Sequence, residues 1–222
     1  EVRGLQGGCR EQGVDVVHAR IACLLEDGRD RSLSQKMPVW NNLLMPTTSA
    51  ESQIIPELAP LPDEIVVTKT TDSALTGTNL RLVLGNMGIR NVVVTGIFTD
   101  QCVSSTVRSL ADESFNVVVV EDCCAAGTEE LHRRELEIIN MIYCHVMTSA
   151  ELRGLMEGRT TILISHRFST VRAAAAAWFA SSCCGGHRPC TSANRPRRLS
   201  WAPVGWWTPR PCSLVGCASA SS

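Results

Sequence analysis

The sequence predicts a three-layer α/β fold, in which helices cover both faces of a parallel β-sheet. Two observations support this prediction. Short runs of valine and isoleucine recur through the first two-thirds of the chain, and segments with helical periodicity separate them. Strands that are apolar on both faces occur mainly in parallel sheets, because helices bury both sides of such sheets.

The expected elements alternate in chain order. A first helix ends near Gln12, where Gly13 stops it, and the first strand covers residues 14–21. Residues 24–62 form a long loop rich in Pro, Asn and Ser, and loops of this length in a compact domain are usually functional or disordered. The remaining strands are expected at 64–69, 91–97, 116–121 and around 145–147, and the helices between them at 78–87, 101–114 and 128–142.

The pattern changes after residue 152, which divides the chain into three parts. Residues 1–152 hold the alternating helices and strands, and residues 153–172 contain one further strand followed by a polar turn. Residues 173–222 include five cysteines and four tryptophans but no Asp, Glu or Lys, and neither periodicity persists there. We therefore expect this last part to be a low-complexity, disordered tail.

The composition argues against several classes of protein. A net charge of −1 gives no reason to expect nucleic acid or an anionic membrane as a partner. No apolar run is long enough to span a bilayer, and the first residues lack a signal-peptide pattern, so we expect a cytoplasmic protein. The chain lacks an initial methionine and begins inside an expected helix, so we also expect it to be a fragment.

The chain holds eleven cysteines, and their spacing predicts neither disulfides nor a metal site. The six before residue 150 lack a framework spacing, and several lie in apolar strands, where cysteine behaves as a small buried hydrophobe. A later cluster does not match the paired spacing of zinc knuckles; it comprises Cys183, Cys184, His187 and Cys190. His18 is a lone histidine on an apolar strand, so we expect no metal.

Cys102 is the first candidate catalytic residue. Gly96 breaks the strand before it, and the segment from Gln101 onward has the pattern of a helix, so Cys102 is expected at a helix N-terminus. A free cysteine is only about 3% thiolate at pH 7, and the helix dipole with its unpaired N–H groups lowers the pKa of a thiol placed there. The position therefore predicts a nucleophile.

Lys69 is the second candidate. Of the 21 basic residues only Lys36 and Lys69 are lysines, and Lys69 ends an apolar strand. Residues just beyond the carboxyl ends of parallel strands line the ligand crevice of an α/β sheet. Cys102 occupies the same kind of position, so we expect both side chains to face that crevice.

Three segments together resemble the isochorismatase-like cysteine hydrolases: IVVTKTTDSALTGTNL (65–80), VTGIFTDQCVSST (94–106) and VVVEDC (118–123). The resemblance covers about residues 14–152 and is nearest to the branch that includes biuret and ureidoacrylate hydrolases, to which residues 26–36 and 45–53 are also similar. It implies a Rossmann-like fold and a homo-oligomeric hydrolase of small amides or carbamoyl compounds that needs no cofactor. Vinyl-ether hydrolysis of isochorismate is the rival activity within the same fold.

The resemblance also implies a Cys-Lys-Asp catalytic triad. Cys102 would attack the substrate carbonyl to give an acyl-enzyme that water hydrolyses, and Lys69 would hold the thiolate and orient the aspartate. Backbone N–H groups around Phe98 and Cys102 would form the oxyanion hole. The family often has a cis peptide bond at the position of Ile97–Phe98.

In one respect the chain departs from this family. The triad aspartate of the family follows a first strand that is central in the sheet, and this chain starts after that point. Asp15, Asp72 and Asp100 do not match the motif, so we expect impaired activity. We also expect the two strands beside the missing one to keep unpaired edges. The alternative from another class is a non-catalytic remnant that only packs or oligomerises.

Residues 155–172 resemble a different family, the ATPases of ABC transporters. His166 falls at the position of the histidine that contacts the γ-phosphate in those proteins. No Gly-x-x-x-x-Gly-Lys-[Ser/Thr] loop for binding phosphates occurs in the sequence, so we exclude ATP hydrolysis.

Overall fold

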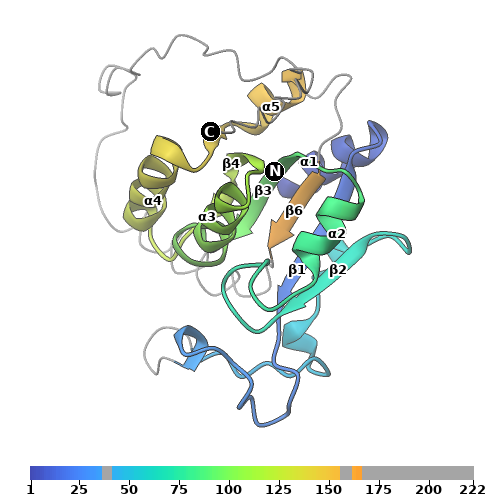
Figure 1. Cartoon of the computed structure of the whole chain (residues 1–222), viewed down its shortest axis with the longest axis vertical. Coiled ribbons are helices and arrows are strands. Elements are labelled where there is room, and N and C mark those ends of the chain that lie inside the picture. The colour runs from blue at the N-terminus through green and yellow to red at the C-terminus, as the bar shows by residue number, and fades with distance from the viewer. Residues whose placement is uncertain (37–41, 156–161, 167–222) are drawn as a thin grey trace, which may run out of the picture. The chain divides into compact units, whose positions relative to one another are not determined.

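Six parallel strands form one sheet in the computed structural model, which describes residues 1–36, 42–155 and 162–166. Across the sheet the strands are β2 (Ile65–Lys69), β1 (Asp15–Ile21), β6 (Ile162–His166), β3 (Asn91–Ile97), β4 (Asn116–Ala125) and β5 (His145–Met147) (Figure 1). Each pairing between neighbours is parallel. The predicted parallel sheet is therefore confirmed.

β6 fills the position between β1 and β3 that the sequence predicts to be empty. Its first residue, Ile162, pairs with Asp15 of β1 and with Val92 of β3. The expectation that β1 and β3 keep unpaired edges is therefore wrong. An empty position would leave two rows of backbone donors and acceptors without partners, and one short extended segment satisfies both rows. The predictions for the His166 side chain and for residues 173–222 lie outside the described residues.

Helices cover both faces of this sheet, as predicted (Figure 1). They are α1 (Val2–Glu11), α2 (Leu80–Asn86), α3 (Ser104–Asp112), α4 (Glu129–Ile142) and α5 (Ser149–Leu155). α1 and α5 pack on one face, and α2, α3 and α4 pack on the other. Successive residues of a strand point to opposite faces of the sheet. Val16 therefore packs in the core beneath α1 and α5, and Val17 packs in the core beneath α2, α3 and α4. Within the described ranges no helix is both long and apolar enough to cross a bilayer.

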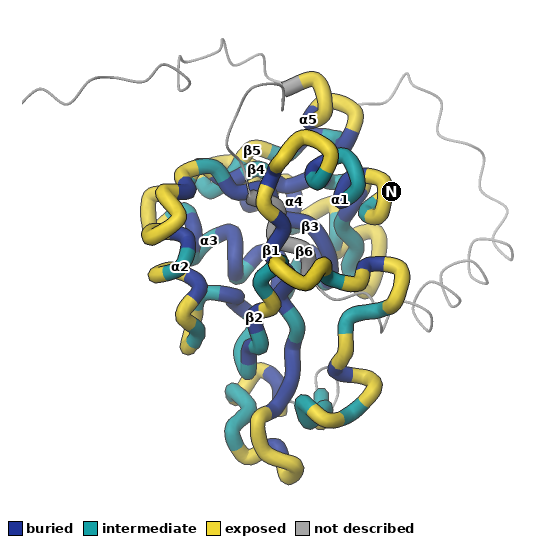
Figure 2. The backbone as a smooth tube through the Cα atoms, turned by 90° about the vertical axis from the view of Figure 1, so that its right-hand side faces the viewer, coloured by how far each residue is buried: buried dark blue, intermediate teal, exposed yellow. Residues whose placement is uncertain are grey.

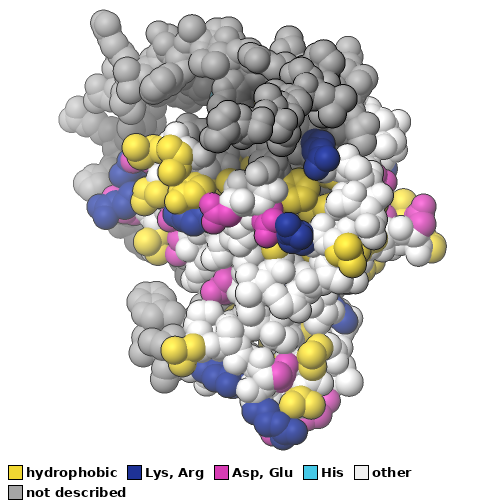
Figure 3. All heavy atoms as spheres, viewed as in Figure 1, with side chains coloured by type: hydrophobic (Ala, Val, Ile, Leu, Met, Phe, Trp, Pro, Cys, Tyr) yellow, Lys and Arg dark blue, Asp and Glu magenta, His cyan; other side chains and the backbone are white. Residues whose placement is uncertain are grey.

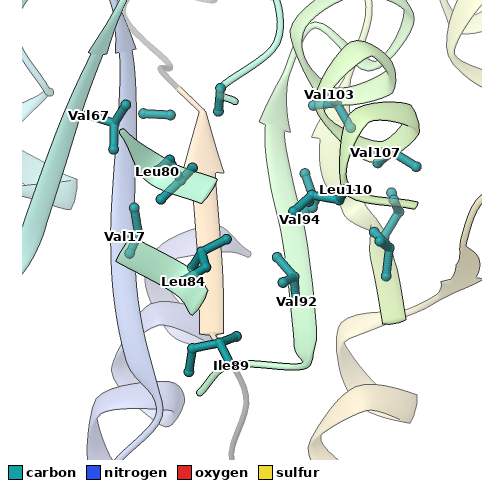
Figure 4. Close-up of a cluster of buried hydrophobic side chains, with 14 of the residues drawn as sticks. Val17, Val67, Leu80, Leu84, Ile89, Val92, Val94, Val103, Val107 and Leu110 are labelled. Atoms are coloured by element: carbon teal, nitrogen blue, oxygen red, sulfur yellow. The ribbon is translucent and has the colours of Figure 1, made fainter. Parts of the chain in front are cut away.

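The larger core holds the segment that follows Cys102 against the sheet. Val103, Val107 and Leu110 are fully buried, and their spacing places them on one face of the chain leading into and along α3. Figure 4 shows these side chains beside strand β3, with Leu80 and Leu84 of α2 in the same cluster. Each fully buried side chain of this size contributes about 1.5–3 kcal/mol, so the backbone around the cysteine is firmly anchored.

The long loop predicted at 24–62 is also confirmed over its described part. It contains only three short 3₁₀ turns, Ser34–Lys36, Ala50–Ser52 and Pro56–Leu58. Figure 2 shows it as a largely exposed tube, whereas the strands are dark with buried residues. The Ser32 N–H donates to the Thr70 carbonyl at 3.0 Å, so the loop returns to the chain directly after Lys69.

Candidate active site

Lys69 and Cys102 lie in contact, although the sequence places them at the ends of two strands that are not neighbours. Lys69 is the last residue of β2, and Cys102 lies in a π-helical turn, Thr99–Val103, between β3 and α3. Lys69 Nζ donates a hydrogen bond of 3.1 Å to Cys102 Sγ. Only 2% of Lys69 and 7% of Cys102 are exposed, so little water screens the interaction.

The buried lysine has an acceptor for each of its three donors. Besides Cys102 Sγ, its Nζ atom donates to the carbonyl oxygens of Thr71 at 3.1 Å and Asp72 at 2.9 Å. An ammonium group carries three N–H donors and no lone pair, which matches this set of three acceptors. The arrangement therefore suits a charged Lys69 and satisfies its hydrogen-bonding groups away from water.

Burial controls the protonation of Cys102. Removal of the thiol from water raises its pKa, and the nearby Asp72 carboxylate raises it further. The Lys69 charge and hydrogen bond, together with a hydrogen bond from the Phe98 backbone, lower the pKa without reversing the balance. The expected lowering of the pKa is therefore wrong, because the sequence does not show how completely this turn is covered. Burial thus favours the thiol over the thiolate in the resting site.

The turn that carries Cys102 is organised around Phe98. The Ile97–Phe98 peptide bond is cis, as the resemblance implies. The Phe98 carbonyl accepts hydrogen bonds of 3.1 Å from the N–H groups of Gln101 and Val103, which closes the turn. The backbone of Phe98 also hydrogen-bonds to the sulfur, so a main-chain donor lies beside the atom that bears the negative charge of a thiolate.

The three aspartates considered from the sequence occupy different places. Asp15 is exposed at the first residue of β1, whereas Lys69 ends the neighbouring strand, so Asp15 lies at the opposite end of the sheet. Asp100 lies in the turn itself and interacts with charged groups of α4. Asp72 lies beside the thiol, with 4.0 Å between Cys102 Sγ and its Oδ1 atom. The sequence comparison with the family motif does not reveal this contact.

The segment that carries Asp72 is fixed to the helix that follows the cysteine. Ser73 Oγ lies 2.9 Å from Ser109 Oγ, and the Ala74 N–H donates to Thr106 Oγ1 at 3.0 Å. Both partners belong to α3. The one sequence signal for Asp72 is its place three residues beyond a strand-ending lysine, in a segment rich in hydroxyl side chains.

His18 belongs to a separate buried network. Its Nε2 atom lies 3.0 Å from Glu64 Oε2, and Arg10 donates hydrogen bonds of 2.7 and 2.8 Å to the same carboxylate. Burial lowers the pKa of His18, and Glu64 partly offsets this effect. In the part of the chain that the structure describes, no three His, Cys, Asp or Glu side chains are grouped so as to hold a metal ion.

Comparison with known proteins gives a consistent set of relatives. The isochorismatase domain model matches residues 2–151. The ureidoacrylate amidohydrolase RutB of Acinetobacter baylyi is 34% identical over 110 residues, which is 49% of this chain and 45% of that protein. The chain thus spans less than half of the length of this curated relative.

Solved structures show the same fold. An isochorismatase-like hydrolase from Alkaliphilus metalliredigens superimposes with a TM-score of 0.63 and 28% identity, covering 70% of this chain and 82% of that one. N-carbamoylsarcosine amidase from Thermoplasma acidophilum superimposes with a TM-score of 0.57 and 25% identity, covering 67% and 80%.

Proposed function

Because the chain belongs to the isochorismatase family of hydrolases, we propose that it is a cysteine hydrolase that cleaves the C–N bond of a small amide or carbamoyl compound. The observation that carries the proposal is the 3.1 Å contact between Lys69 Nζ and Cys102 Sγ. Both residues lie at or just beyond the carboxyl ends of parallel strands, where open α/β sheets bind their ligands. We assign Cys102 as the nucleophile and Lys69 as its electrostatic partner.

The chemistry begins with the sulfur. Attack of Cys102 Sγ on the substrate carbonyl gives a tetrahedral intermediate, loss of the nitrogen leaving group gives an acyl-enzyme, and water then releases the acid. The Lys69 ammonium, in hydrogen-bond contact with Sγ, stabilises the thiolate as it forms. Because both groups are buried, this stabilisation is stronger than it would be in water.

The oxyanion needs donors that are already in place. Backbone N–H groups around Phe98 and Cys102 are proposed to serve, since the Phe98 backbone already hydrogen-bonds beside the sulfur. Removal of one such donor costs a factor of about 10²–10³ in rate in other hydrolases. The closed turn, with its two hydrogen bonds to the Phe98 carbonyl, keeps these donors oriented before substrate arrives.

The substrate class is proposed from two observations. Two relatives carry the names ureidoacrylate amidohydrolase and N-carbamoylsarcosine amidase, and both names denote carbamoyl-nitrogen compounds. In the described part of the loop that returns to Thr70, the basic side chains already have partners: Arg29 pairs with Asp27 at 2.7 Å, and Lys36 donates to the Arg29 carbonyl at 2.9 Å. A neutral carbamoyl group suits such a loop better than the two carboxylates of isochorismate.

Release of ammonia from a panel of N-carbamoyl amino acids and ureido acids tests the proposal. We expect the wild-type chain to release ammonia and the Cys102→Ala variant to lose at least about 10³-fold of this activity, because no acyl-enzyme forms without the sulfur. Intact-protein mass spectrometry of acid-quenched wild-type samples should show the mass of the acyl group.

The matched control is Cys144→Ala, which removes a partly buried thiol that packs against the core away from the Lys69 contact. This variant should retain wild-type activity. Ammonia release that persists in Cys102→Ala, or its absence from the wild-type chain with every substrate, would contradict the proposal.

The distribution of surface charge bears on the kind of partner that we propose. On the face shown in Figure 3, basic and acidic side chains are interspersed without a continuous basic patch among the coloured residues, which suits a small-molecule substrate better than nucleic acid. A cytoplasmic location and a homo-oligomeric state stay predictions, and size-exclusion chromatography with light scattering would measure the second.

A further inference from the structure

We propose that Asp72 is the proton carrier of this site: it takes the proton of the Cys102 thiol during attack and delivers it to the nitrogen that leaves. The inference rests on the proposed cysteine-hydrolase function and goes beyond it. The family motif does not assign this role to a residue at this position, three places after the strand-ending lysine. Three observations on the site lead to it.

The first observation is that Lys69 cannot accept the thiol proton. Its Nζ atom donates to Cys102 Sγ, to the Thr71 carbonyl and to the Asp72 carbonyl, which uses all three donors of an ammonium. Such a group has no lone pair left to take up a proton. Lys69 can therefore stabilise negative charge on the sulfur, but the proton has to leave by another route.

The second observation is that the sulfur is buried, with Cys102 only 7% exposed. Burial holds the pKa of the Cys102 thiol above its ordinary value, in spite of the nearby lysine. A thiol is a poor nucleophile compared with its thiolate. The attack thus needs a base within reach of Sγ at the moment when the carbon–sulfur bond forms.

The third observation is the position of the Asp72 carboxylate. Cys102 Sγ lies 4.0 Å from Asp72 Oδ1, with the thiol as donor, while Lys69 Nζ approaches the same sulfur as a donor. The backbone on both sides of Asp72 is held, because the Thr71 carbonyl accepts from Lys69 and the Ala74 N–H donates to Thr106 of α3. Hydrogen bonds of catalytic pairs are often long before substrate binds and shorten in the complex.

The proposed steps balance in protons and electrons. As the sulfur–carbon bond forms, the thiol proton passes to the Asp72 carboxylate and the carbonyl π electrons move to oxygen. When the oxyanion collapses, the C–N bond breaks and the carboxylic acid of Asp72 protonates the departing nitrogen. In the second half, water attacks the thioester carbonyl, Asp72 takes a proton from water, and the expelled thiolate recovers that proton from Asp72.

Two reactions of the Asp72→Asn variant separate proton transfer from the reactivity of the sulfur. Hydrolysis of the N-carbamoyl substrate needs a proton on the leaving nitrogen, so it should fall by about 10²-fold or more. Release of p-nitrophenolate from p-nitrophenyl acetate needs no proton on the leaving group, so Asp72→Asn removes only the base from this reaction. The burst that accompanies acylation of Cys102 should therefore fall by a smaller factor than amide hydrolysis does.

Alkylation by iodoacetamide gives a readout that a purely structural role would not produce. Asp72 raises the pKa of Cys102, so its replacement by Asn should bring a larger share of the sulfur into the thiolate form. Between pH 7 and 9, Cys102 of Asp72→Asn should be alkylated faster than in wild type, whereas its amide hydrolysis is slower. Asp112→Asn, an exposed carboxylate at the end of α3, is the matched control and should change neither rate.

The outcomes distinguish the two proposals. If the wild-type chain hydrolyses the carbamoyl substrate and Asp72→Asn does so equally well, the role of Asp72 is overturned and the cysteine-hydrolase function stands. If amide hydrolysis, the ester burst and Cys102 alkylation all fall together in Asp72→Asn, Asp72 is only structural and the proposal is again overturned. If the wild-type chain shows neither ammonia release nor a burst that depends on Cys102, both proposals fail.

Discussion

Lys69 and Cys102 are separated by two strands of the sheet, yet a single hydrogen bond joins their side chains. The reach of the lysine side chain makes this contact possible, and burial gives it strength. A lysine out of water is costly unless its donors are satisfied, and here two carbonyls and one sulfur satisfy them. At the scale of single residues, the site is thus a buried charge with a fixed set of acceptors.

Replacement of Lys69 should therefore make the Cys102 thiol less reactive. In Lys69→Met the charge and the hydrogen bond that lower the pKa of Cys102 are lost, while burial still raises it. We expect the rate of Cys102 alkylation by iodoacetamide at pH 8 to fall about tenfold or more, with amide hydrolysis falling at least as far.

Lys36 offers the matched control, since it is the other lysine of the chain and donates to the Arg29 carbonyl at an exposed site. Lys36→Met should leave the alkylation rate of Cys102 at the wild-type value, as measured by peptide mapping with mass spectrometry. An unchanged alkylation rate in Lys69→Met would show that the lysine does not control the sulfur.

The sequence predicts that Lys69 and Cys102 belong to the site, because both lie at or just beyond strand ends and local sequence patterns indicate where those strands end. It misses the contact of Asp72 with the thiol, because the path of that loop depends on hydroxyl side chains that bind a helix distant in sequence. It also gives the wrong direction for the pKa of Cys102, since the thiol is buried against residues distant in sequence, among them Lys69 and Asp72.

At the scale of secondary-structure elements, β6 connects two groups of strands. One group is β1 with β2, and the other is β3, β4 and β5. In the described sheet, β6 is the strand that pairs with a member of each group. Lys69 belongs to the first group and Cys102 follows a strand of the second. The backbone hydrogen bonds that connect the strands carrying the two site residues therefore run through β6.

A proline in the middle of β6 should loosen this link. Ile164 pairs with Val17 on one side and Val94 on the other, and Ile164→Pro removes a ladder donor and places a ring between strands. A buried backbone group left without a partner costs about 1–3 kcal/mol, so the urea midpoint should fall accordingly.

Ile164→Val keeps the N–H group and serves as the control, with an expected loss of about 0.5–1.5 kcal/mol at most. Amide hydrogen exchange at Val17 and Val94 should accelerate in the proline variant and stay slow in the valine variant. Equal exchange rates in the two variants would mean that β6 does not stabilise its neighbours.

The alternation of strands and helices is predictable at this scale, whereas the place of β6 is not. Apolar β-branched runs identify β3 and β4 from the sequence alone, and the helices between the strands follow from their periodicity. No local pattern indicates that a strand after residue 160 lies between two strands from the first half of the chain. That position is decided by backbone groups that need partners, which is a property of the assembled sheet.

For the molecule as a whole, the network of Arg10, His18 and Glu64 predicts how stability depends on pH. Burial alone would raise the pKa of Glu64, but hydrogen bonds from Arg10, the Leu61 N–H and His18 outweigh it and lower that pKa from 4.5 to about 2. The folded pKa lies below the unfolded one, so this stabilisation is complete above about pH 4.5 and is lost as the pH falls toward 2. The lowered pKa of His18 acts in the same direction.

Urea unfolding between pH 7 and pH 3 measures this dependence. The free energy of unfolding of the wild-type chain should decrease as the pH falls, with Glu64 contributing no more than about 3 kcal/mol. Glu64→Gln should be less stable at pH 7 and should show a weaker pH dependence. Asp63→Asn, which changes the exposed neighbouring carboxylate, should follow the wild-type curve; if Glu64→Gln follows it too, the network does not account for acid lability.

The central position of β6 also determines when the sheet can be completed during synthesis. A ribosome makes β1 and β3 long before it makes the strand that lies between them, since residues 15–21 and 91–97 pair with residues 162–166. During synthesis the nascent chain thus exposes two open sheet edges, and contacts between residues so distant in sequence form slowly. Open strand edges favour pairing with other chains, so association through these two edges is favoured until residues 162–166 are translated.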